Sequence, residues 1–264
     1  MHPHISFTVS RKKIWRKWSL AVKIIPVILV VALLKYLFHR YNLEAMELNA
    51  LFTSLVAGTI FLIGFLISGV LTDYKESEKI PGELATSLIT LKDDTWTIDK
   101  SRNSAAAKKF SAFQKTFVND MMDWFYKKIK TKALLEKITE MNEYLAALEL
   151  EGVQPNYIIK LKNEQNFLRK TVIRIHTIRD TEFVGSAYAI VEAMGFLVVA
   201  GLLLIKIEPF YASLFFTLLV TFLIAYMFML IKDLDNPFDY SIHGESGTEI
   251  SLKPLHDVVA EFKG

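Results

Sequence analysis

Four apolar segments, each long enough to cross a lipid bilayer, constrain this chain most strongly. They cover about residues 20–38, 51–71, 184–205 and 210–231. A transmembrane helix needs about 20 mostly apolar residues to cross a hydrocarbon core of roughly 30 Å. Only residues 206–209 separate the last two segments, which must therefore form a tight helical hairpin. The sequence predicts an all-α membrane protein with four transmembrane helices in the lipid bilayer.

The composition agrees with membrane spans that alternate with a soluble part. Hydrophobic residues make up 52% of the 264 residues, yet 22% of the residues are charged. A net charge of +3 is too small to indicate nucleic-acid binding. The chain has no cysteine, which excludes disulfides, thiolate metal sites and a cysteine nucleophile.

Basic residues set the orientation that we predict for the chain. Lysine and arginine near the ends of spans favour the cytoplasmic side of the membrane. Six of them precede or begin the first span: Arg11, Lys12, Lys13, Arg16, Lys17 and Lys23. An even number of spans returns the C-terminus to the side of the N-terminus. We therefore predict a multi-pass protein of the cell membrane, with both termini, the insert 73–182 and the tail 232–264 in the cytoplasm.

The large insert between the second and third spans has the pattern of amphipathic helices. Apolar residues recur at spacings of three and four, which places them on one helical face. Two such stripes consist of Phe110, Phe113, Phe117, Met121 and Trp124, and of Leu134, Ile138, Met141, Leu145 and Leu148. Gly152 and Pro155 predict a turn, and a further helix is expected from Pro155 to about Arg179. The lysine pairs at 108–109 and 127–128 are interpreted as solvated faces of these helices.

The tail after the fourth span contains fewer signals. The stretch 241–248 is rich in glycine and serine and is predicted to be a loop. Ile250, Leu252 and Leu255 are expected to anchor a short extended segment after it.

The second span carries two contrasting faces. At 100° per residue, one quarter of its circumference carries small residues and two aromatic residues: Ser54, Ala57, Phe61, Gly64, Phe65, Ser68 and Thr72. The opposite side carries Leu55, Ile60, Leu62, Ile63, Leu66, Ile67 and Val70. A face of small residues suits close contact between helices, and it also suits a pore wall. Periodicity alone favours helix packing over pore lining.

Two short motifs shift the interpretation of this face from helix packing toward pore lining. The run Phe61-Leu62-Ile63-Gly64-Phe65 in the second span has the form F-x-x-G-F, and Asp235-Asn236-Pro237-Phe238 follows the last span. Motifs of this kind at these places resemble the bestrophin family. The following segment, Thr248-Glu249-Ile250-Ser251-Leu252-Lys253-Pro254-Leu255, is especially similar to the bacterial bestrophin-like domain family, whose function is largely unassigned. The order of the spans and the large insert agree with this resemblance, which implies a single bestrophin-like domain over residues 1–264.

Bestrophins are pentameric anion channels with five copies of the second helix around one axis. The resemblance implies that Phe61 and Phe65 line a hydrophobic neck and that Ala57 lies one turn further out. Animal members have a larger apolar residue at that outer position and hold calcium with an acidic run after the Pro-Phe motif. Here Asp239 is the only acid directly after that motif. One carboxylate is a poor site for a cation that takes six or more oxygen ligands, so we predict no metal site.

Glu192 lies inside the third span. An ionisable residue at membrane depth is a candidate functional residue, and a protonated or hydrogen-bonded glutamate at a helix interface is an equally good interpretation. The chain contains no helical zinc motif, no phosphate-binding loop and no nucleophile elbow. We therefore predict no catalytic residues, no cofactor and no enzymatic activity.

The sequence leaves two functions open. The first is a homopentameric channel that passively conducts small inorganic ions, with chloride as the ion that the resemblance implies. The second is a non-conducting membrane scaffold or sensor, in which the cytoplasmic helices bind a partner and the second span only packs.

Overall fold

A computed structural model describes residues 8–181, 185–242 and 249–263 of the chain, with side chains described for Trp18 and from Leu20 onward. The chain forms two compact units. One contains Met1–Asp73 and Phe183–Asp235, and the other contains Tyr74–Glu182 and Asn236–Gly264. The secondary-structure elements of the described residues are helices, apart from two strands of two residues each.

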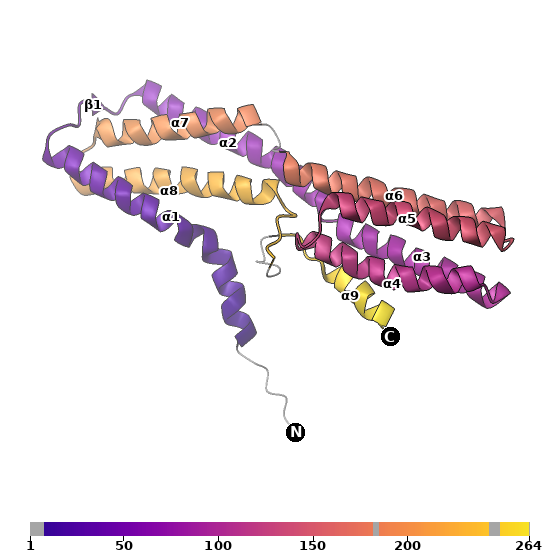
Figure 1. The fold of residues 1–264 in the computed structure, drawn as a ribbon. Helices are drawn as coiled ribbons and strands as arrows, with labels where there is room; N and C mark the ends of the chain where they lie inside the picture. The colour runs from indigo at the N-terminus through magenta and orange to yellow at the C-terminus, as the bar shows by residue number, and fades with distance from the viewer. Residues whose placement is uncertain (1–7, 182–184, 243–248, 264) are drawn as a thin grey trace. The chain divides into compact units, whose positions relative to one another are not determined.

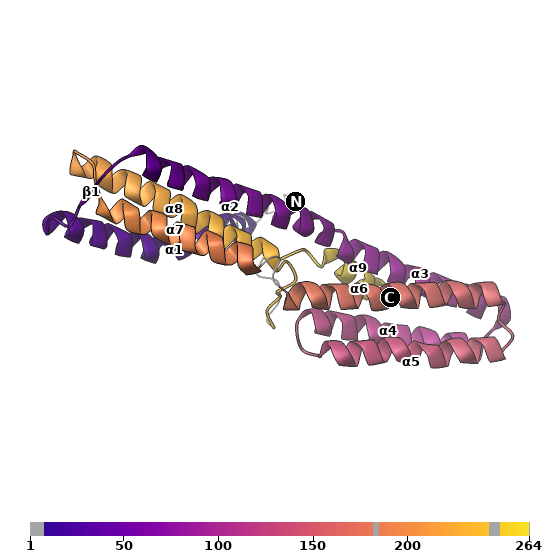
Figure 2. The ribbon, with the colours of Figure 1, turned by 90° about the horizontal axis from the view of Figure 1, so that it is seen from above.

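The first unit contains the four predicted spans. They lie in α1 (Thr8–Arg40), α2 (Ala50–Ser77), α7 (Gly185–Leu204) and α8 (Phe210–Asp235). All four helices are long and apolar enough to cross a membrane, which confirms the predicted number of spans. Within this unit α1, α7 and α8 lie side by side (Figures 1 and 2). The predicted first residue of the third span, Val184, lies outside the described residues.

The two short links between the spans of this unit pair with each other. β1 (Met46–Glu47) and β2 (Ile205–Lys206) run parallel, and Met46 is aligned with Ile205. The link between α7 and α8 is as short as predicted, and its Glu208–Pro209 peptide bond is cis. The pairing ties the α1–α2 link to the end of α7.

The second unit is a helical bundle. It consists of α3 (Ile80–Arg102), α4 (Ala105–Phe125), α5 (Thr131–Leu150) and α6 (Pro155–Asp180), which run along one another (Figures 1 and 2), and of the short α9 (Lys253–Lys263). Both predicted apolar stripes are buried in one core. The predicted turn is also present, and Gly152 adopts a left-handed φ of 76° in it.

Two predictions for this unit are wrong in part. Lys127 and Lys128 do not lie on a helical face, because α4 ends at Phe125 and Lys127 turns the chain with a φ of 59°. Leu255 belongs to α9 rather than to an extended segment. Its spacing to Val258 and Phe262 is the helical three and four, and all three residues are buried. Residues 243–248 of the predicted loop lie outside the described residues.

Candidate pore-lining face and its surroundings

The predicted face of small and aromatic residues on α2 is uncovered within the protomer. The side chains of Phe61 and Phe65 are 72% and 75% exposed. Ser54, Ala57, Gly64, Ser68 and Thr72 on the same face are exposed as well. The structure thus brings all seven predicted residues onto one free surface of α2.

The other side of α2 packs against other helices of the first unit, which is called the membrane unit below because it contains the four predicted spans. Ile63, Leu66 and Val70 are almost completely buried in a cluster with residues of α7 and α8. Of the other residues predicted there, Leu55, Leu62 and Ile67 are half-buried and Ile60 is exposed. This packing fixes which face of α2 remains free.

A close approach of two helices sets the position of the N-terminal part of α2. The ring of Phe52 is buried, and it lies against the backbone of α7 at Gly201. A Cβ atom at Gly201 would lie 2.3 Å from Cε2 of Phe52, so a larger residue does not fit there. Gly64 differs, because apart from its chain neighbours and the nearby backbone of its own helix, no atom of the described residues lies within 4 Å of the Cβ that it lacks.

Two of the three hydroxyls on the free face, those of Ser54 and Thr72, are satisfied by α2 itself. The hydroxyl of Ser54 donates to the carbonyl of Ala50 at 2.8 Å, and that of Thr72 donates to the carbonyl of Ser68 at 3.0 Å. Hydroxyls that bond to the preceding turn present little unsatisfied polarity to a neighbour. These two hydroxyls therefore add little uncompensated polarity where the face meets another helix or a narrow apolar passage.

The membrane unit also contains a buried charged network that sequence reasoning did not identify. Lys35 near the end of α1 is fully buried, and its ammonium group donates to the carbonyls of Leu202 at 3.1 Å and Ile205 at 2.6 Å. These carbonyls lie at the C-terminal end of α7, where backbone acceptors lack helical partners and attract cations. Glu44 completes the network through an ion pair with Lys35 at 2.7 Å and a contact with His39 Nδ1 at 2.8 Å. A lysine inside an apolar span was the one available signal.

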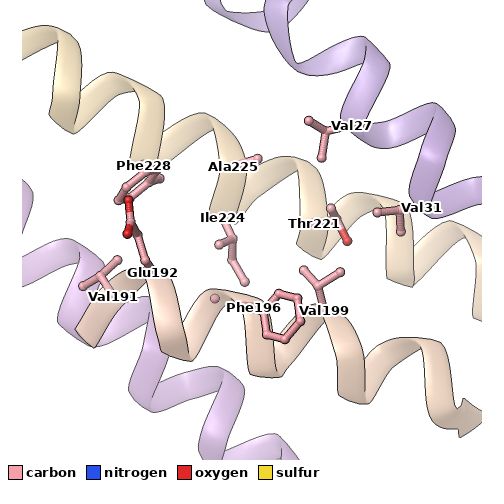
Figure 3. Close-up of a pocket in the computed structure, with 11 residues that line it drawn as sticks. Val27, Val31, Val191, Glu192, Phe196, Val199, Thr221, Ile224, Ala225 and Phe228 are labelled. Carbon is pink, nitrogen blue, oxygen red and sulfur yellow. The ribbon is translucent and has the colours of Figure 1, made fainter. Parts of the chain in front are cut away.

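Glu192 lies at the edge of an apolar cavity between α1, α7 and α8 (Figure 3). The cavity has a volume of about 280 Å³. The carboxylate forms an ion pair with Lys232 at 3.2 Å, and the Lys232 ammonium lies 4.6 Å from the centre of the Phe228 ring. Glu192 is therefore paired, which fits the interpretation of a bonded glutamate between helices.

The motif after the fourth span lies at the start of the second unit. α8 ends at Asp235, and Asn236 donates from Nδ2 to the carbonyl of Arg179 at 3.5 Å. Phe238 is fully buried in the bundle core, and its carbonyl accepts from Arg179 Nε at 3.0 Å. Pro237 accepts at its carbonyl from the backbone N–H of Ile250 at 3.1 Å. These contacts give Asn236, Pro237 and Phe238 a structural role in holding the tail on the bundle.

The acid that follows this motif has a partner other than a metal ion. Asp239 forms an ion pair with Lys127 in the α4–α5 turn. Within residues 8–181, 185–242 and 249–263 no group of three or more His, Asp or Glu side chains is placed to hold a metal ion.

Comparison with known proteins identifies the fold. No protein-family model and no curated protein matches the sequence. Crystal structures of point variants of a bacterial bestrophin homologue from Klebsiella pneumoniae are similar to this chain. Three of them have TM-scores of 0.73, 0.74 and 0.73 and sequence identities of 15%, 15% and 14%. The similarity covers 91%, 90% and 92% of this chain and 97%, 96% and 100% of those chains. The protein therefore has the bestrophin fold, as the two motifs predicted.

Proposed function

We propose that this protein is a homopentameric ion channel in which five copies of α2 surround a central pore that passively conducts chloride. The fold supports a multi-pass membrane protein of the bestrophin type. The pore, the number of subunits and the ion are inferences from the free face of α2 together with the resemblance to bestrophins. The two compact units would then act as one bestrophin-like domain over residues 1–264.

The free face of α2 is the observation that carries this proposal. Elsewhere in the membrane unit, exposed positions carry large apolar side chains suited to lipid: on α8 these include Phe215, Phe216, Leu219, Phe222 and Leu223. The free face of α2 instead carries glycine, alanine, serine and threonine beside its two phenylalanines. Small residues let helices approach closely and are enriched where membrane helices meet each other. Contact with further copies of the chain around an aqueous axis explains such a face better than contact with lipid.

Phe61 and Phe65 give the proposed pore its barrier. They are four positions apart in the sequence, so their rings stand one helical turn apart on the same face. Five copies of each would form two aromatic rings around the axis, with a wider ring of Ala57 one turn further out. A narrow apolar ring can stop ions by excluding water, and aromatic edges carry partial positive charge that can face an anion.

The remaining predicted residues would allow the helices to assemble. Ser54, Gly64, Ser68 and Thr72 add little bulk beside the two phenylalanines, so neighbouring copies of α2 can lie close together. Glu192 is paired with Lys232, and the proposal assigns it no role in conduction.

The particle mass and the chloride flux of one preparation test the proposal together. The purified protein is measured in detergent by light scattering and then reconstituted into liposomes for a chloride efflux assay. We expect five subunits and an efflux above that of empty liposomes. A monomer or dimer would eliminate the pore. A pentamer without flux would favour the scaffold or sensor. Flux of potassium in place of chloride would show that the channel selects cations rather than anions.

A further inference from the structure

Arg179, near the end of α6, is a largely buried cation that is held by backbone carbonyls. Its guanidinium donates to the carbonyls of Phe238 at 3.0 Å and Phe125 at 3.1 Å and lies 4.6 Å from the centre of the Trp124 ring. No carboxylate among the described residues lies within ion-pair distance of it. Burial lowers the pKa of Arg179 to about 10, with the charges of Tyr240 and Asp239 acting in the opposite direction. The group is therefore still charged at neutral pH, and a buried charge without a counter-ion favours a nearby anion.

The guanidinium lines a cavity of about 490 Å³ in the second unit, and the lining contains further basic residues. Lys127, Lys130 and Lys132 contribute three further cations, against the two carboxylates of Asp180 and Asp239. The cavity is within the size range of small-molecule sites. Its charged lining is thus positive overall, with four cations and two acids.

Each of the two carboxylates that line the cavity already pairs with a basic side chain of the protein. Asp239 pairs with Lys127, and Asp180 lies 3.4 Å from His176 Nδ1. Lys130 and Lys132 have no acidic partner within the part of the chain that the structure describes. Their ammonium groups are exposed and can bind a ligand without breaking an existing ion pair.

The start of α5 adds backbone donors to the same cavity. Lys130 is the N-cap residue of this helix of 20 residues, and its side chain makes no capping hydrogen bond. The first N–H groups of a helix lack helical acceptors, and they attract anions together with the helix dipole. Thr131 also lines the cavity, and its hydroxyl accepts from Trp124 Nε1 at 3.1 Å, which leaves that hydroxyl's proton free to bond elsewhere.

Asn236 links the cavity along the chain to the last apolar helix. It lines the cavity and directly follows Asp235, the last residue of α8. Moreover, Oδ1 of Asn236 is buried without a hydrogen-bond partner among the described residues, and it could accept from a ligand hydroxyl.

We propose that this cavity binds a phosphate monoester, with Lys130, Lys132 and the N-terminus of α5 as its ligands and Arg179 as the buried counter-charge. A phosphate monoester carries between one and two negative charges at neutral pH and three strong acceptor oxygens. Its protonated form has a hydroxyl that can donate a hydrogen bond to Oδ1 of Asn236. The group could come from the headgroup of phosphatidic acid or from a soluble phosphate ester. The inference does not depend on ion conduction.

Calorimetric titration of the full-length protein in detergent tests the site and distinguishes the two sources. The lipid arm uses dioctanoyl phosphatidic acid, with dioctanoyl phosphatidylcholine as the comparison. The soluble arm uses glycerol 3-phosphate. The test variant is Lys130→Gln with Lys132→Gln. The matched control is Lys128→Gln, because Lys128 lies in the same turn but pairs with Asp123 and does not line the cavity.

We expect the double variant to lose at least about tenfold in affinity for the phosphate monoester, because charge-assisted hydrogen bonds are among the strongest polar contacts. The control should stay within about twofold of wild type. Binding of both compounds would mean recognition of the phosphate group itself, and binding of phosphatidic acid alone would assign the site to a lipid headgroup. Either result supports the proposal. Equal affinity for dioctanoyl phosphatidylcholine, an equal loss in the control, or no binding by wild type in either arm would overturn it.

Discussion

The ammonium nitrogen of Lys35 lies 2.7 Å from a carboxylate oxygen of Glu44, and neither side chain is more than 4% exposed. The two residues belong to the end of α1 and to the link that follows it. The same ammonium binds carbonyls at the end of α7. One buried cation therefore connects three segments of the membrane unit, and its removal should affect all of them.

Loss of this cation should destabilise the protein strongly. Removing one partner of a buried ion pair leaves the other charge uncompensated and typically costs about 3–5 kcal/mol. We expect Lys35→Ala to lower the free energy of unfolding by about that amount, measured by denaturant titration in detergent with circular dichroism. Lys23→Ala is the control, because Lys23 is exposed on the same helix, and it should change stability by less than about 0.5 kcal/mol.

A second substitution separates the charge from the packing. Lys35→Met combined with Glu44→Gln removes both charges and keeps most of the volume, so it should cost less than Lys35→Ala alone. Equal losses in the single and the double variant would show that the ion pair is not the source of the effect.

The same network predicts a pH dependence on the acid side. Burial raises the pKa of Glu44, but its contacts with Lys35 and His39 outweigh burial, and the net pKa is lowered from 4.5. A lowered pKa in the folded state means that the unfolded state binds the proton more readily, so stability decreases as pH falls. The contribution of Glu44 should be complete above pH ~4.5 and be lost progressively below it.

Thermal unfolding between pH 7 and pH 3 measures this contribution. We expect the unfolding temperature of wild type to fall below pH ~4.5 more steeply than that of Glu44→Gln, which has no such proton to bind. Glu47→Gln is the matched control, since Glu47 is exposed in the same link, and its curve should follow wild type. A parallel fall of all three curves would contradict the role of Glu44.

Two glycines of the membrane unit should respond in opposite ways to a larger side chain. Gly64 faces open space in the protomer, whereas a Cβ at Gly201 would collide with the ring of Phe52. We expect Gly201→Ala to lower protomer stability by about 1–3 kcal/mol, the usual range for overpacking. Gly64→Leu should leave the protomer stable and, if the proposed pentamer forms, weaken assembly instead, because the added bulk would meet a neighbouring subunit.

Light scattering and thermal unfolding of both variants distinguish these effects. An intact oligomer of Gly64→Leu with unchanged flux would show that the free face of α2 is not a close contact between subunits.

The local features of the fold could be predicted from the sequence, but the long-range pairings could not. The spans follow from hydropathy, and the free face of α2 follows from periodicity, because both depend on neighbouring residues alone. Lys35 reaches carbonyls more than 160 positions away in the chain, and no spacing rule connects them. The bounds of α3 cannot be predicted from the apolar pattern, because the buried side of this helix includes polar residues. Ser87 donates to Glu164 at 2.6 Å, and Thr95 accepts from Gln114 at 2.8 Å, so the apolar stripe of α3 is interrupted.

The orientation of the chain remains a prediction that a reporter can test. The basic residues before the first span and the even number of spans place the C-terminus in the cytoplasm. Alkaline phosphatase is active only outside the cytoplasm. It should be inactive when fused after Gly264 and active when fused after Leu43, in the link between the first two spans, which the predicted orientation places outside. Activity after Gly264 would reverse the orientation.

The channel proposal depends most directly on Phe61 and Phe65. If their rings form the neck of the pore, their removal should widen it, admit water and lower the barrier to ions. We expect Phe61→Ala with Phe65→Ala to give a larger and less regulated chloride efflux from liposomes than wild type. Because both side chains are exposed in the protomer, the double variant should keep its fold.

Leu62→Ala is the matched control for this change. Leu62 is half-buried on the other side of α2, so its truncation should leave the efflux near that of wild type. Phe52 is a poorer control than Leu62, because its ring is buried against Gly201 and its loss would also leave a cavity. The scaffold interpretation predicts the reverse order: the two phenylalanines would only pack between subunits, and the double variant would assemble poorly without gaining any current. Efflux and particle mass must therefore come from one preparation. An intact pentamer whose efflux does not respond to the double substitution would disprove the neck at Phe61 and Phe65, even though the fold would stand.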